Sequence, residues 1–104
     1  MIAINPPVAA GGGAERNSIP GYDLPAWRIV SHRLLAMPIR TSALRSLGAF
    51  ANVFAIESFL DELAAGRGED PLALRLRLLA EPRARAVLEA AARRANWAGW
   101  AKRE

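Results

Sequence analysis

The fold of this chain is decided by residues 49–65, which read AFANVFAIESFLDELAA. On a helical wheel of about 100° per residue, the large apolar side chains of this stretch cover an arc of about 220°. The arc consists of Phe50, Val53, Phe54, Ile56, Phe59, Leu60 and Leu63. A helix on the surface of a monomer carries a narrower apolar stripe, so we expect this helix to be packed on most of its sides.

One carboxylate, Glu57, falls inside the apolar arc, with Val53 one turn before it and Leu60 one turn after it. An unpaired carboxylate in such a place carries a large desolvation cost, so it must be hydrogen-bonded or paired. We therefore interpret Glu57 as a structural carboxylate that fastens a neighbouring loop. A catalytic role is the alternative.

Local signals place two further helices after the first one. Gly66-Arg67-Gly68 is typical of a glycine C-cap. Asp70-Pro71 and Glu81-Pro82 each put an acid before a proline, which is typical of the start of a helix. The sequence thus predicts three helices, at about 49–65, 71–79 and 82–96.

The residues before the long helix predict one strand and an irregular arm. Apolar and polar residues alternate imperfectly over residues 26–37, between Pro25 and Pro38, and this pattern indicates a strand partly covered on both faces. Residues 1–21 are rich in proline and glycine and show no periodicity. The predicted fold class is α+β but mostly α: an extended N-terminal arm and one strand, followed by three helices.

Composition excludes several kinds of site. The chain has no cysteine and a single histidine, His32, so it cannot form a disulfide, a thiolate metal site or a multi-histidine site.

The net charge is +4, and the basic residues are spread from Arg16 to Arg103 among acids and apolar residues. A dispersed pattern is more typical of a solvated surface than of a phosphate-binding stripe, which disfavours nucleic acid. A small basic helical module that binds nucleic acid or a partner protein is the alternative function.

The sequence lacks the signals of membrane insertion, and its core pattern covers only part of its length. No apolar run reaches the roughly 18–20 residues needed to cross a bilayer, and the N-terminus lacks the order of a secretory signal. We expect a cytoplasmic location, with the periplasm, for an exported parent enzyme, as the alternative. Residues 49–97 carry the core-forming pattern, and the strand at 26–37 has no partner strand in the sequence. We therefore expect another polypeptide, or the rest of a longer one, to supply the missing partners.

Long strings of this sequence resemble the large, molybdopterin-binding subunit of the molybdenum hydroxylases, the xanthine dehydrogenase and aldehyde oxidase family. The resemblance is to the bacterial isoquinoline 1-oxidoreductase β-subunit type. The strings that carry it are Gly11–Asn17, Tyr22–Pro25, Met37–Gly48, Asn52–Ala64, Asp70-Pro71 with Arg75, and Pro82–Ala92. The family hydroxylates an aldehyde or an N-heterocycle with oxygen from water. A molybdenum–pterin dinucleotide takes two electrons and passes them to iron–sulfur clusters, which in this type lie on a separate small subunit.

The resemblance implies that the loop at residues 44–48 lies beside the cofactor. Arg45, Ser46 and Gly48 are the residues predicted to bind the cofactor. Leu47 is predicted to line the substrate pocket, at a position where relatives with aromatic substrates carry a phenylalanine. The residues themselves favour the same interpretation, because a glycine-hinged loop at a helix N-terminus presents amide donors to an anionic group.

This sequence lacks several features of the family, and their absence limits the function that we expect of the chain alone. The family subunit is several times longer, and nothing here matches the motif near its far end that contains the catalytic glutamate. The resemblance therefore predicts a partial molybdopterin-binding domain at residues 22–104, with no catalytic residue and no metal ligand of its own. We expect it to be inactive alone and not to bind the cofactor alone, which leaves its status as an enzyme undecided. The expected partners are the remainder of the large subunit and an iron–sulfur small subunit.

Overall fold

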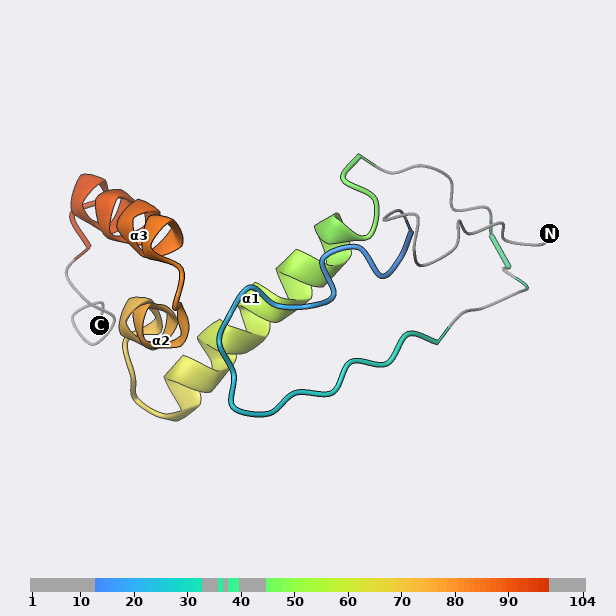
Figure 1. Ribbon diagram of the computed structural model, residues 1–104, viewed down its shortest axis with the longest axis horizontal. Coiled ribbons are helices and arrows are strands. Elements are labelled where there is room, and N and C mark those ends of the chain that lie inside the picture. The colour runs from blue at the N-terminus through green and yellow to red at the C-terminus, as the bar shows by residue number, and fades with distance from the viewer. Residues whose placement is uncertain (1–12, 33–35, 37, 40–44, 98–104) are drawn as a thin grey trace. The chain divides into compact units, whose positions relative to one another are not determined.

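The computed structural model describes residues 13–32, 36, 38, 39 and 45–97. The described residues hold three helices: α1 (Ala49–Gly66), α2 (Pro71–Leu78) and α3 (Pro82–Arg94) (Figure 1). The prediction of three helices is therefore confirmed, and each predicted end lies close to the observed one. None of these helices is both long and apolar enough to cross a membrane.

The predicted strand at residues 26–37 is wrong. Its described residues, 26–32 and 36, lie in no strand, and Figure 1 draws residues 26–32 as an irregular trace. A strand needs a neighbour for its backbone N–H and C=O groups, and a single strand is not stable. The prolines around this segment favour extended geometry without supplying that neighbour. The fold class is therefore mostly α, with no strand among the described residues.

The connection between α1 and α2 follows the local signals of the sequence. Gly68 adopts a left-handed conformation, with φ of 62°. Its N–H donates to the carbonyl of Ala65 at 3.1 Å, and the N–H of Glu69 donates to the carbonyl of Ala64 at 2.9 Å, which is the Schellman arrangement. The carboxylate of Asp70 then accepts from the N–H of Leu72 at 2.9 Å and caps α2.

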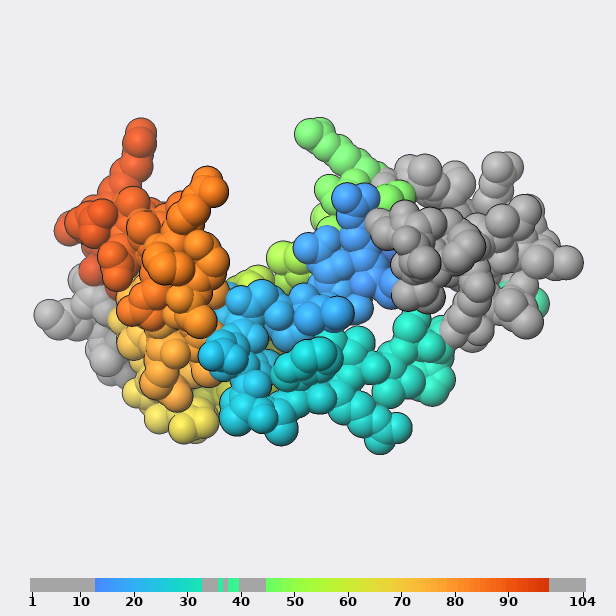
Figure 2. All heavy atoms as spheres, in the orientation of Figure 1, coloured from blue at the N-terminus to red at the C-terminus, as the bar shows by residue number. Residues whose placement is uncertain are grey.

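Helices α2 and α3 pack against each other (Figure 2). Glu81 caps α3 by accepting from the N–H of Ala84 at 2.6 Å. The guanidinium of Arg85, on the first turn of α3, donates to the carbonyl of Leu76 and, at 3.1 Å, to the carbonyl of Leu79. These bonds satisfy carbonyl groups at the C-terminal end of α2, which have no partner within the helix.

The chain divides into two compact units, and α1 contributes to both. One unit takes its described residues from 1–20 and 27–56, and the other takes them from 21–26 and 57–104. The buried apolar residues Leu60, Ala64 and Leu74 all lie in the second unit.

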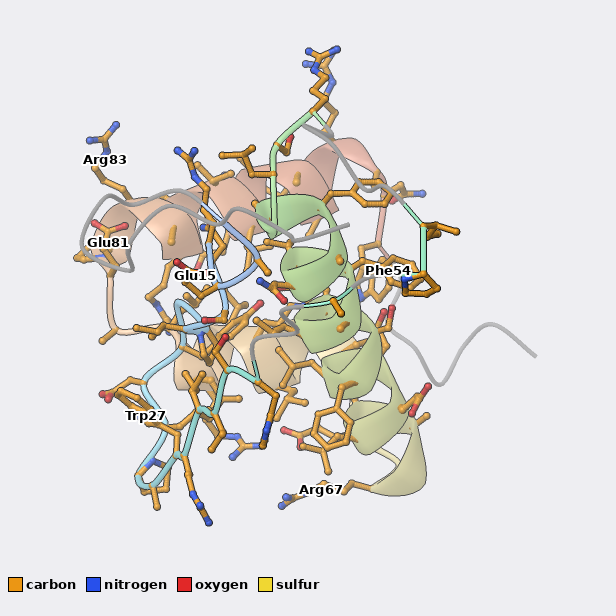
Figure 3. All side chains as sticks on the ribbon, turned by 90° about the vertical axis from the view of Figure 1, so that its right-hand side faces the viewer. Glu15, Trp27, Phe54, Arg67, Glu81 and Arg83 are labelled. Atoms are coloured by element: carbon orange, nitrogen blue, oxygen red, sulfur yellow. The ribbon has the colours of Figure 1, made fainter. Side chains whose placement is uncertain are left out.

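Most of the apolar arc of α1 is not covered by the described residues. The side chains of Phe50, Phe54 and Phe59 are 70%, 72% and 63% exposed, and Figure 3 shows Phe54 projecting from the helix. The covering that the arc requires therefore does not come from the described part of this chain.

Candidate functional site

The predicted site residues form the turn that leads into α1. Ser46 and Leu47 both have left-handed backbone conformations, with φ of 72° and 54°. Such a conformation costs a residue with a Cβ atom about 1–2 kcal/mol, because the Cβ crowds the next carbonyl oxygen. Two such residues in succession persist only where the surroundings hold them in place. The turn closes through a bond from the N–H of Ala49 to the carbonyl of Ser46 at 3.0 Å.

The segment at residues 13–16, which begins with Gly13, lies directly against this turn. The N–H of Gly48 donates to the carbonyl of Gly13 at 3.2 Å. A Cβ atom on Gly48 would lie 2.4 Å from the carbonyl oxygen of Ala14 and 2.6 Å from that of Gly13. Gly48 is therefore required by the close approach of the chain's own backbone, at residues 13 and 14.

Asn52, one helical turn after Gly48, fastens the same segment. Its Nδ2 donates to the carbonyl of Ala14 at 2.6 Å and to the carbonyl of Arg16 at 2.9 Å. Its backbone N–H donates to the carbonyl of Gly48 at 3.0 Å. Sequence reasoning missed this role, although a carboxamide in a strongly apolar helix, one turn from a glycine, is a signal that could have indicated it.

The structure places the predicted residues in different surroundings. The side chains of Arg45, Ser46 and Leu47 are exposed, Leu47 only to 37%, whereas Gly48 is half-buried. Together with residues 13–16 they surround the N-terminus of α1, whose first turn carries no acid. That end of the helix therefore keeps its positive partial charge. The contact of Arg45, Ser46 and Gly48 with a cofactor, and of Leu47 with a substrate, stays a prediction.

The carboxylate of the segment at 13–16, on Glu15, has an unusual environment. Oε1 of Glu15 is buried and has no hydrogen-bond partner among the described residues. A Cβ atom on Gly13 would lie 2.8 Å from Oε2 of the same carboxylate, so this side chain folds back against its own turn. Glu15 thus has a buried acceptor oxygen, next to Gly13, that the described residues leave without a donor.

A second polar cluster, in the other unit, is centred on Glu57. Its carboxylate accepts from the hydroxyl of Tyr22, at 2.9 Å to Oε1 and 3.0 Å to Oε2, and from Nε of Arg75 at 2.9 Å to Oε2. Nη1 of Arg75 also donates to Oδ1 of Asp61 at 2.7 Å. The expectation that Glu57 is paired and fastens a loop, here the one that carries Tyr22, is confirmed.

The pKa values of this cluster follow from burial and from its hydrogen bonds. Burial, together with the hydrogen bond to Glu57 and the negative charge of that carboxylate, raises the pKa of Tyr22 to about 12. Burial by itself lowers the pKa of Arg75. Its bonds and attraction to Glu57 and Asp61 outweigh that effect, so the net pKa is raised. Both groups are therefore fixed as hydrogen donors at neutral pH, which suits a structural tie.

A pocket of about 260 Å³ lies in the same unit and has mostly apolar walls, among them Leu72, Leu88 and Trp97. The indole Nε1 of Trp97 donates to both carboxylate oxygens of Asp70 at 3.2 Å. None of the predicted site residues lines this pocket. Among the described residues, no group of three or more His, Cys, Asp or Glu side chains is placed to hold a metal ion.

The joined turns at 13–16 and 45–48 come from two of the strings on which the resemblance rests. The profile of the molybdopterin cofactor-binding domain matches residues 6–79, and the chain belongs to this family. It is similar to a subunit of nicotinate dehydrogenase from Pseudomonas putida (strain KT2440), with 39% identity over 95 residues. The alignment covers 91% of this chain but 8% of that relative. No solved structure matches the chain. The predicted membership of the molybdenum hydroxylase family is confirmed.

Proposed function

We propose that this chain forms one wall of the molybdopterin site in a molybdenum hydroxylase, and that the turn at residues 45–48 faces the cofactor. One observation carries the proposal. Two strings more than thirty residues apart in sequence meet at the N-terminus of α1, where Gly48 donates to Gly13 and Asn52 donates to Ala14 and Arg16. A joint of this kind gives a rigid rim of backbone and small side chains, which is what close approach of a ligand requires.

The residues of this rim fit an anionic, pterin-containing group. The first turn of α1 has no acid, and Arg45, four residues before the helix begins, is exposed. Both the helix N-terminus and the Arg45 guanidinium favour phosphate oxygens. The free Oε1 of Glu15 suits an N–H donor, such as those on the edge of a pterin ring. When bound, the cofactor would supply two-electron oxidation chemistry with water as the source of oxygen.

Each residue of the turn has a separate task in this proposal. Arg45 binds and orients the anionic part of the cofactor through its forked donors. Leu47 presents an apolar side chain that excludes water and contacts the substrate. Ser46 keeps the backbone close to the cofactor, and Gly48 lets residues 13 and 14 pack against the turn and support it. The name of the relative favours an N-heterocyclic substrate of the nicotinate kind for the enzyme to which this chain contributes.

The remaining walls of the site come from other residues of the large subunit. The chain spans less than a tenth of the length of the relative that it matches. In the described residues, the apolar arc of α1 lacks cover over Phe50, Phe54 and Phe59. We therefore propose that the rest of a large subunit packs on this arc, and that an iron–sulfur small subunit receives the electrons.

The test replaces the matching segment of the nicotinate dehydrogenase relative with this chain and measures the pterin bound to the purified protein. We expect the chimera to retain pterin and to lose about tenfold or more of it on Arg45→Ala, because a charge-assisted contact to phosphate is lost. Arg67→Ala is the control, since Arg67 is an exposed arginine near the opposite end of α1. A chimera that assembles in normal yield but carries no pterin would overturn the proposed function.

A further inference from the structure

We infer that Asn52 is the positioning residue of the cofactor-facing turn. Its carboxamide holds the segment at 13–16 against Gly48 and thereby keeps Ser46 and Leu47 in their left-handed conformations. The cofactor-facing part of this inference rests on the proposed function, whereas the positioning of the turn can be measured without any cofactor.

The two hydrogens of the Asn52 side-chain amide each bind a different backbone carbonyl. Nδ2 of Asn52 reaches the oxygen of Ala14 at 2.6 Å and that of Arg16 at 2.9 Å. Gly48 adds a third bond, from its N–H to the carbonyl of Gly13. Three carbonyls of one short segment therefore accept from donors on Gly48 and Asn52, which stand four residues apart at the start of α1. The segment is held at several points along its length, so it cannot tilt away from the turn.

Only a short carboxamide fits this position. The two partners of Nδ2 are both carbonyl oxygens, which cannot donate, so the side chain must supply two hydrogens. An aspartate would direct a carboxylate at two acceptors and repel them. An alanine would supply no donor, and a glutamine would carry its amide one methylene too far. Because the N–H of Asn52 donates to the carbonyl of Gly48, directly before α1, with the spacing of one helical turn, the amide stands at a fixed height above the turn.

The strained backbone of the turn at Ser46 and Leu47 indicates the role of Asn52. Ser46 and Leu47 occupy a left-handed region that residues with a Cβ atom avoid, and neither is a glycine or an asparagine. The segment at 13–16 lies against Gly48, the residue directly after Leu47, at the place where a Cβ atom on Gly48 would lie. Holding that segment in place therefore holds the two strained residues as well. Asn52 acts through the turn rather than by touching a cofactor.

The first arm of the test uses the full 104-residue chain and nuclear magnetic resonance. It compares Asn52→Ala and Asn52→Asp with Glu62→Gln, an exposed change on the same helix. We expect both changes at Asn52 to speed hydrogen exchange of the Gly48 amide about tenfold or more, and to move the backbone couplings of Ser46 and Leu47 away from left-handed values. The amides of α2 and α3 provide an internal reference for folding and should keep their exchange rates. Unchanged Gly48 exchange and unchanged couplings in Asn52→Ala would overturn the inference.

The second arm measures pterin in the chimera described above. We expect Asn52→Asp to lower the bound pterin about tenfold while the assembly of the chimera is unchanged, and Glu62→Gln to leave both unchanged. A loosened turn that still binds pterin as tightly as the unchanged chimera would overturn the link between positioning and cofactor. If the unchanged chimera binds no pterin while the first arm gives the expected result, the proposed function fails and the positioning by Asn52 is supported.

Discussion

Nε of Arg75, on α2, donates to Oε2 of Glu57, on α1, at 2.9 Å. The same guanidinium donates to the backbone carbonyls of Glu57 at 3.0 Å and Pro71 at 3.2 Å, and to the carboxylate of Asp61 at 2.7 Å. Its side chain is only 12% exposed, so few of its donors can turn to water. Arg75 is therefore the residue that ties the second half of α1 to α2, and Glu57 extends this tie to the loop of Tyr22.

Removing the Arg75 side-chain charge should destabilise this unit. We expect Arg75→Met to lower the free energy of unfolding by about 2 kcal/mol, since it removes the cation paired with Glu57 and Asp61 and the donor to two backbone carbonyls, although Tyr22 still donates to Glu57. Arg77→Met is the control: Arg77 pairs with Glu69 at 2.6 Å but is 53% exposed, so its loss should cost at most about 1 kcal/mol. Urea denaturation followed by circular dichroism measures both. Equal losses for the two variants would contradict the assigned role of Arg75.

Tyr22 gives a direct optical reading of the same cluster, because it is the only tyrosine in the sequence. Its phenol should titrate near pH 12 in the folded chain, above the ordinary value of 10.0. Glu57→Gln should lower that pKa, because it removes the carboxylate's charge, yet leave it above 10.0, because burial is the largest cause of the shift. The ultraviolet absorbance of tyrosinate measures the titration. A midpoint unchanged by Glu57→Gln would show that the carboxylate does not act on the phenol.

The raised pKa of Tyr22 also predicts how stability changes with pH. Below pH 10 the phenol is protonated in both the folded and the unfolded chain, and its stabilising contribution is fully present. As the pH rises from 10 to about 12, the unfolded chain loses the proton first, so the free energy of unfolding falls. Tyr22→Phe should lack this part of the decline. Urea denaturation at several alkaline pH values compares the two chains, and identical curves would contradict the linkage.

The close approach at Gly48 makes it intolerant of any side chain. A Cβ atom there would lie 2.4 Å from the carbonyl oxygen of Ala14, so Gly48→Ala must push the segment at 13–16 away, at a cost of about 1–3 kcal/mol. Gly66→Ala is the control, because nothing lies within 4 Å of the added Cβ and the residue is helical. It should be neutral or stabilise by up to about 1 kcal/mol. Thermal unfolding of the two variants distinguishes them, and equal effects would contradict the close contact.

Local signals in the sequence were enough to predict the helices and their ends. Asp70-Pro71 and Glu81-Pro82 start α2 and α3, since each acid caps an N–H within three residues of itself. Gly68 terminates α1 because its φ angle is left-handed. The strand at 26–37 was wrongly predicted because a strand depends on a neighbour, and alternation within one segment carries no information about that neighbour. Extended residues between prolines therefore look the same whether or not they are paired.

The candidate site was predicted only in part, for a similar reason. The turn at 45–48 was found through the resemblance, and the need of Glu57 for partners followed from its place in an apolar arc. Those partners, Tyr22 and Arg75, lie 35 and 18 residues away from Glu57 in the chain, so the sequence did not identify them. The contacts of Asn52 span 38 and 36 residues. Contacts at such separations leave no periodic pattern in a single sequence, so the fastening of the segment at 13–16 could not be predicted.

The uncovered apolar arc of α1 gives the last prediction, which separates folding from assembly. Phe54 is 72% exposed, so Phe54→Ser should change the free energy of unfolding of the chain by no more than about 0.5 kcal/mol. Leu60→Ser, at a position only 6% exposed on the same helix, should cost about 3 kcal/mol or more, because it leaves a cavity and buries a hydroxyl. In the chimera with the nicotinate dehydrogenase relative, we expect Phe54→Ser to be no longer the harmless one of the two substitutions. Phe54→Ser should then lower the yield of folded protein sharply, since an aromatic side chain that fills a partner's pocket contributes strongly to association. A chimera that tolerates Phe54→Ser would mean that the rest of the large subunit does not pack on this face of α1.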